Sequence, residues 1–210
     1  MNEIENKLDD FFENWKDDKN SRYLSWEHCY SFFKENKNKV LSDETMQDMA
    51  FLHLAFYLAS WGMYRGSSNL LWKDYKVHKD LITELLSKCS NLYNKKISWD
   101  ELKNANEIIK KHCKNYNIKP TDTLITKILM GIFGCIPAYD RFFIEGLKKY
   151  NKNHDVIQQT YNEQSFEQLQ KIAENLKYKN NTRNYPVMKL LDTYFWWTGG
   201  GKEAHQKRAK

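Results

Sequence analysis

Met49-Ala-Phe-Leu-His-Leu-Ala-Phe-Tyr-Leu-Ala-Ser-Trp-Gly-Met-Tyr64 is the longest stretch of the chain without a charged side chain. Its sixteen residues fall short of the ~20 that a membrane-spanning helix needs, so the run predicts a buried central helix. Apolar residues recur at helical spacing on both sides of it, and strand-like alternation is nearly absent. The eight glycines and three prolines are too few for the many turns of an all-β protein. We therefore predict an all-α fold.

Further helices are predicted outward from this run by apolar periodicity and by capping residues. Ser98 with Glu101 and Ser165 with Gln168 have the spacing of capping boxes, and Pro120 and Pro186 suit helix starts. The predicted helices cover residues 8–19, 23–36, 42–64, 73–88, 98–116, a segment from 121 that carries Lys127, 141–150, 165–177 and 186–197.

These elements indicate one compact multi-helix domain over residues 1–198, with two lobes and a cleft near residues 90–120 as the alternative arrangement. The glycine run 199–201 is expected to release a flexible basic tail, residues 199–210. The first twenty residues hold seven acidic residues and three lysines, unlike a signal peptide. Four well-separated cysteines without a C-x-x-C pair are typical of reduced thiols, which predicts a cytoplasmic location.

The net charge of +6 is unevenly distributed. Residues 1–20 carry −4, whereas from Arg141 onward thirteen Lys and Arg face seven Asp and Glu. A basic, aromatic-rich chain favours a polyanionic partner, and nucleic acid is the commonest one. A lysine-rich protein without such a partner is the alternative. We expect no membrane partner, and the oligomeric state stays open.

The central run carries a polar and aromatic stripe. His53, Tyr57 and Trp61 follow one another at intervals of four residues, and Tyr64 continues beside them, so they share one helix face. Such a face can stack a planar base and bind its edge. Equally, these side chains can be core residues with internal partners.

Two short segments offer polar groups at helix ends. Arg65-Gly-Ser67-Ser68 can hold a phosphate through its guanidinium, hydroxyls and amides, or can simply end the helix. Pro137-Ala-Tyr139-Asp140-Arg141 follows the apolar run 128–136 and places an acid where a helix begins. Asp140 can therefore be a catalytic carboxylate or a helix cap.

Residues 121–150 resemble the helix-hairpin-helix (HhH-GPD) DNA glycosylase superfamily, because a helical segment leads through an apolar turn to an aspartate at a helix start. The glycine-rich G-x-G hairpin of that family is absent, and the run from Ile125 to Gly131 stands in its place. The resemblance implies that Asp140 is the catalytic acid and that Lys127 matches the Schiff-base lysine of the bifunctional members. Lys127 on a solvated helix face is the alternative.

The function that follows from this resemblance is a DNA-binding glycosylase that flips and excises a modified or damaged base, for example in phage defence. DNA is favoured over RNA. Tyr139 and Arg141 beside the acid would join His53, Tyr57, Trp61, Tyr64, Arg65, Ser67 and Ser68 in binding the substrate. We expect no cofactor and no metal, since the adjacent residues of His28-Cys29 and of His112-Cys113 diverge by roughly 100° on a helix.

Two other functions stay open. A non-catalytic helical module that binds nucleic acid or a partner protein needs no acid chemistry. Arg22 and His28, with five residues between them, are similar to the loose R-x4–6-H pattern of HEPN ribonucleases, although Tyr23 departs from the polar residue usual after the arginine.

Overall fold

A computed structural model describes residues 2–94 and 96–207. Over these residues the chain forms helices joined by turns and no β-strand, which confirms the all-α prediction. Within the same ranges no helix is both long enough and apolar enough to cross a bilayer. The chain divides into two compact units. We call Asn20–Cys135 the inserted unit, and Met1–Lys19 with Ile136–Lys210 the terminal unit.

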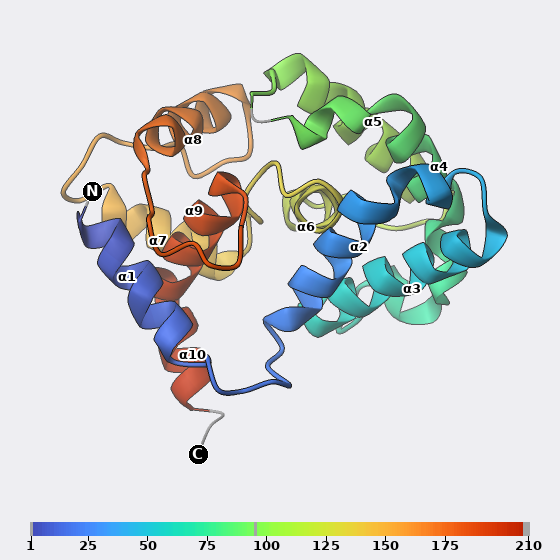
Figure 1. Cartoon of the computed structure of the whole chain (residues 1–210). Coiled ribbons are helices and arrows are strands. Elements are labelled where there is room, and N and C mark those ends of the chain that lie inside the picture. The colour runs from blue at the N-terminus through green and yellow to red at the C-terminus, as the bar shows by residue number, and fades with distance from the viewer. Residues whose placement is uncertain (1, 95, 208–210) are drawn as a thin grey trace. The chain divides into compact units, whose positions relative to one another are not determined.

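The inserted unit contains five α-helices and three short 3-10 helices among its described residues (Figure 1). The α-helices are α2 (Leu24–Val40), α3 (Glu44–Ser60), α4 (Lys79–Lys88), α5 (Trp99–Asn115) and α6 (Asp122–Ile132). The 3-10 helices are η1 (Asn69–Trp72), η2 (Tyr75–His78) and η3 (Ser90–Tyr93). The Ser98–Glu101 capping box is present, since each side chain accepts the other residue's backbone N–H.

The most enclosed helix of the inserted unit is α6, in which residues 124–132 are all buried. The sequence prediction for the central helix was wrong on this point, because α3 exposes Met49, Leu52 and Phe56 on one side. The α3 helix also ends at Ser60, four residues earlier than expected. Trp26 ties α2 to α6 by donating its indole N–H to the carbonyl of Met130 at 2.9 Å.

The terminal unit is built from helices that come from both ends of the chain. They are α1 (Asn2–Glu13), α7 (Arg141–Tyr150), α8 (Glu163–Asn175), α9 (Val187–Trp196), the π-helical turn η4 (Trp197–Gly201) and α10 (Lys202–Gln206). In Figure 1 the N-terminal helix α1 lies beside α9 and α10. The predicted Ser165 capping box is shifted, because Asn162 is the N-cap of α8 and Ser165 is its partner.

The glycine run 199–201 packs closely instead of releasing a flexible tail. A Cβ on Gly199 would collide with the carbonyl of Phe142, and one on Gly146 with the carbonyl of Phe195. The backbones of α7 and of the α9–η4 segment therefore touch, which only glycine permits. Helix α10 follows this run, so the chain is ordered up to residue 207, where a flexible tail had been expected. Residues 208–210 lie outside the described part of the chain.

The two units differ in net charge. The inserted unit holds 17 Lys and Arg against 12 Asp and Glu, whereas the terminal unit holds 16 against 15. The acidic N-terminal helix and the basic C-terminal segment belong to the same unit, and Lys202 pairs with Asp10 at 2.9 Å. The excess positive charge is therefore carried by the inserted unit.

Candidate functional site

Asp140 lies at the N-terminus of α7 and caps it. Its backbone is extended (φ −93°, ψ 175°), and its Oδ1 accepts the backbone N–H of Phe142 at 3.0 Å and of Phe143 at 3.1 Å. A cap of this kind stabilises a helix by about 1 kcal/mol.

The loop that carries Asp140 is fixed by buried side chains of the terminal unit. Asp192 Oδ1 accepts the backbone N–H of Ala138 at 2.9 Å, and Asp192 Oδ2 accepts from Lys189 Nζ at 2.7 Å. The two charged side chains are only 9% and 10% exposed. Tyr139 is buried and donates its hydroxyl to Ser165 Oγ at 2.9 Å. The acid is therefore held by a rigid backbone on both sides of the turn.

The two neighbours of Asp140 differ in their surroundings. Tyr139 points into the interior of the terminal unit through its bond to Ser165, so it acts there as a packing residue. Arg141 is exposed, with its guanidinium 4.7 Å from the centre of the Phe142 ring. Of these two predicted substrate-binding residues, only Arg141 is exposed at the surface.

The aromatic stripe of α3 packs against α2 and α6. His53 stacks on Phe32 with ring centres 4.2 Å apart, and Trp61 donates its indole N–H to Ser25 Oγ at 3.1 Å. Tyr57 lies on Gly131 of α6, where a Cβ would come within 2.7 Å of its ring. Burial, with a smaller contribution from His28, lowers the pKa of His53. His53 and Tyr57 are thus committed to helix packing, whereas Trp61 and Tyr64 lie beyond the end of α3 at Ser60.

Lys127 is buried, with 3% of its surface exposed, so the alternative of a solvated helix face is wrong for this residue. Its Nζ donates to the carbonyl oxygen of Trp61 at 2.9 Å and lies 5.7 Å from the centre of the Trp61 ring. A cation at the C-terminal end of α3 interacts favourably with the last carbonyls of the helix. Lys127 therefore joins α6 to the end of α3.

The segment after α3 contains the other predicted substrate-binding residues. Tyr64 shares a hydrogen bond of 2.8 Å with His78 Nε2, and burial raises the pKa of Tyr64 to about 12. Ser68 caps η1 by accepting the backbone N–H of Leu70 at 3.3 Å. Arg65 and Ser67 are exposed. Ser68 thus has a structural role, whereas Arg65 and Ser67 present polar groups to solvent.

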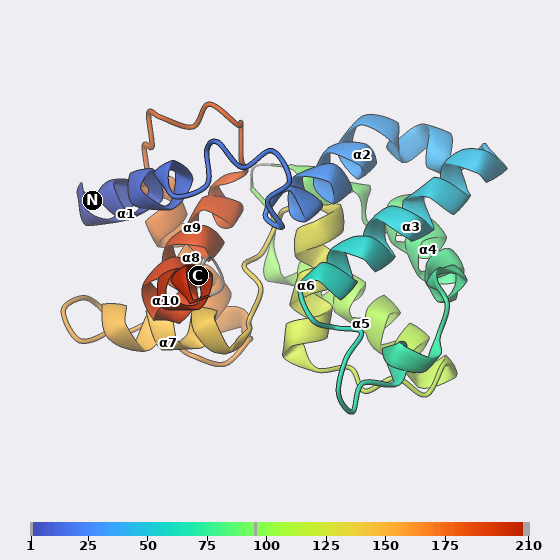
Figure 2. The same ribbon diagram turned by 90° about the horizontal axis from the view of Figure 1, so that it is seen from below.

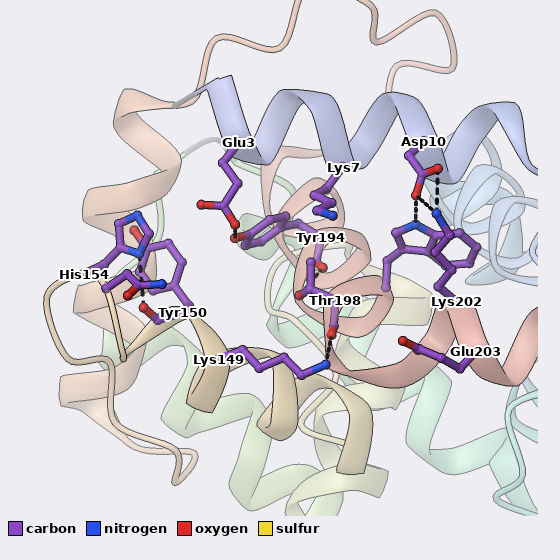
Figure 3. A pocket seen from close by; sticks show the side chains of 12 residues that line it. Glu3, Lys7, Asp10, Lys149, Tyr150, His154, Tyr194, Thr198, Lys202 and Glu203 are labelled. Atoms are coloured by element: carbon purple, nitrogen blue, oxygen red, sulfur yellow. Dashed lines mark hydrogen bonds and ion pairs between the residues drawn. The ribbon is translucent and has the colours of Figure 1, made fainter.

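A pocket of about 340 Å³, which no sequence pattern above indicated, lies in the terminal unit (Figure 3). Its aromatic lining comes from Tyr150, Tyr194 and Trp197, and its charged lining from Glu3, Lys7, Asp10, Lys149, Lys202 and Glu203. The spacing of Glu3, Lys7 and Asp10 on one face of α1 is the sequence signal that could have indicated it.

Most of the charged groups around this pocket hold its helices together. Asp10 Oδ2 accepts from Trp197 Nε1 at 2.7 Å and from Lys202 Nζ at 2.9 Å. Partial burial raises the pKa of Asp10, but the hydrogen bonds from Lys202 and Trp197 outweigh it and lower the pKa. Lys149 Nζ donates to the carbonyl oxygen of Thr198 at 2.7 Å. These contacts join α1 and α7 to the C-terminal helices.

The two residues of the ribonuclease-like pattern differ in their surroundings. Arg22 places its guanidinium 4.5 Å from the centre of the Trp61 ring, and His28 is exposed on α2. Over residues 2–94 and 96–207, no three His, Cys, Asp or Glu side chains gather closely enough to hold a metal ion. No family model matches this chain, and no curated protein or solved structure is significantly similar to it.

Proposed function

We propose that the protein binds DNA and excises a modified or damaged base, with Asp140 as the catalytic carboxylate. The observation that carries this proposal is the fixed position of the acid, since Asp192 and Ser165 hold the turn that leads to it. A carboxylate held at a helix start needs no reorganisation when charge develops beside it.

The chemistry would break the N-glycosidic bond and join a hydroxyl to the sugar carbon. The Asp140 carboxylate would stabilise the cationic sugar or accept a proton from the attacking water, and the leaving base would take up a proton. Exposed Lys and Arg side chains would contact the phosphates. Lys127 has no covalent role in this proposal, because its amine is buried against the end of α3.

A second function is favoured by one observation. Asp140 caps α7, so the presence of an acid at this position has a structural explanation that involves no catalysis. A non-catalytic nucleic-acid-binding module would keep the same cap and the same positively charged inserted unit.

Incubation of the purified protein with duplexes that each contain one modified base tests the first proposal. We expect one of the duplexes to yield free base and an abasic site that alkali cleaves. Salt-dependent binding to every duplex without product from any of them would favour the non-catalytic module.

A further inference from the structure

Trp72 is the most exposed large apolar side chain in the described part of the chain, with 81% of its surface accessible. Its neighbour Leu71 is 46% exposed, whereas Leu70, Val77 and His78 of the same segment are buried. Single exposed apolar residues are ordinary. Here the exposed ring belongs to a segment whose residues on both sides are buried, so a mobile loop does not explain its exposure.

Several hydrogen bonds fix the backbone around Trp72. Ser68 caps η1, and Asp74 caps η2 by accepting the backbone N–H of Lys76 at 2.8 Å. The Tyr75 hydroxyl donates to the carboxylate of Asp48 at 3.1 Å. The side-chain amide of Asn69 donates to the carbonyl of Asn117, which joins η1 to the connection between α5 and α6. The indole is therefore presented to solvent by a rigid support.

The segment that carries the indole is rich in basic residues, and the acids of neighbouring elements that contact it or the α5–α6 connection are Asp48 and Asp80. Arg65, Lys73, Lys76 and Lys79 are all exposed, and Asp74 is the single acid between residues 65 and 79. The connection that Asn69 contacts adds further charge, because residues 110–121 contain four lysines and no acid. Figure 2 shows the segment after α3 beside the connection from α5 to α6.

We propose that this surface of the inserted unit, which we call the Trp72 surface, binds single-stranded nucleic acid. Trp72 stacks on an unpaired base, and Lys73, Lys76 and Lys119 contact the phosphates. The inference rests on the proposed function only in naming nucleic acid as the partner. An anionic membrane is the less suitable occupant, because the segment offers two exposed apolar side chains and no long amphipathic helix.

The test measures the affinity of the full chain for a fluorescent oligo-dT of about fifteen nucleotides at about 50 mM salt. Trp72→Ala should weaken binding by about 5- to 150-fold, the range for one base–aromatic stack. Trp72→Phe should keep most of the affinity. The plot of log affinity against log salt has a negative slope, and Lys73→Ala and Lys76→Ala should each make that slope less steep by about 0.7.

Val156→Ala is the matched control, since Val156 is 63% exposed and belongs to the terminal unit. It should leave the affinity unchanged, and the thermal midpoints of all these variants should stay at the wild-type value. The inference would be overturned if the wild-type protein did not bind oligo-dT, or if Trp72→Ala bound it with the wild-type affinity. The inference would also be overturned if Trp72→Ala lost the binding of the full chain to anionic vesicles and kept its binding to oligo-dT. Normal oligo-dT binding without base release would refute the excision proposal and leave the Trp72 surface standing.

Discussion

The carboxylate of Asp192 accepts the backbone N–H of Ala138 at 2.9 Å, two residues before Asp140. Its other oxygen accepts a hydrogen bond from the buried amine of Lys189. A distant part of the chain, on α9, thus sets the backbone of the loop that presents the candidate acid. Burying two charges for this purpose is costly unless their geometry and hydrogen bonds are well satisfied.

Removing one member of the buried pair should be more damaging than replacing both. Asp192→Ala leaves Lys189 buried without its carboxylate, and we expect a loss of about 3–5 kcal/mol in the free energy of unfolding. The double variant Lys189→Met with Asp192→Ala should recover the part of that loss that comes from the unpaired amine, although the Ala138 N–H still lacks its acceptor. Urea unfolding measures both. A double variant as unstable as the sum of the two single variants would show that the pair is not coupled.

Gly131 should be essential for the packing of α6 on α3. Gly131→Ala places a methyl group within 2.7 Å of the Tyr57 ring, and overpacking of this kind costs about 1–3 kcal/mol. Combination with Tyr57→Leu should relieve the clash, so the double variant should lose less than the two single losses added together. Calorimetric or urea unfolding gives the values. Equal stability of wild type and Gly131→Ala would contradict the close contact.

Acid should destabilise the inserted unit through its buried histidines. Burial, with a contribution from His112, lowers the pKa of His78 to about 3, and burial also lowers the pKa of His112. The His78 ring therefore stays neutral in the folded chain at pH values where the unfolded chain takes up a proton, below about pH 6.5, and the folded His112 ring takes up its proton at a lower pH than the unfolded one does. Each histidine should therefore reduce the unfolding free energy by up to about 1.4 kcal/mol per pH unit below that value.

The comparison between wild type and His78→Gln isolates this effect. Between pH 6.5 and 5, above the range where most carboxylates titrate, the wild type should lose stability more steeply than the variant. Urea unfolding at each pH measures the two slopes. Identical slopes would mean that His78 takes up its proton at the same pH in the folded and the unfolded chain, in conflict with its burial.

Lys127 should matter for stability and not for chemistry. Lys127→Met keeps the length of the side chain but removes the hydrogen bond to Trp61 O, so we expect a loss of about 1–3 kcal/mol because that carbonyl loses its partner. Base release at a temperature where the variant stays folded should be unchanged. A folded Lys127→Met that has lost all product would instead support the Schiff-base role.

The sequence indicated local structure well and packing poorly. Residues 141–150 form the helix expected, and the Ser98–Glu101 capping box is present, because both depend on neighbours along the chain. The division into two units depends on the contact of α1 with the C-terminal helices, which no local pattern reveals. For the same reason the glycine run 199–201 suggested a flexible tail, although its lack of side chains serves the contact with α7.

The candidate site shows the same division. The position of Asp140 at the start of a helix was predictable from Pro137 and the apolar run before it. Its support by Asp192 was not predictable, since the two residues are 52 positions apart in the sequence. The exposure of Trp72 was equally hidden, because an aromatic residue among apolar neighbours is usually buried.

The central claim is that the Asp140 carboxylate performs chemistry in addition to capping α7. Asn is about as good an N-cap as Asp, whereas Ala is not. Asp140→Asn should therefore unfold at nearly the wild-type urea concentration, and Asp140→Ala should lose about 1 kcal/mol.

The decisive measurement is the single-turnover rate of base release by Asp140→Asn on the duplex that the wild type cleaves best. We predict a rate at least about a hundredfold below that of the wild type, as expected for a lost acid–base group, with the affinity for the duplex unchanged or raised. A rate close to that of the wild type, with only Asp140→Ala impaired, would contradict the claim and leave Asp140 as a helix cap.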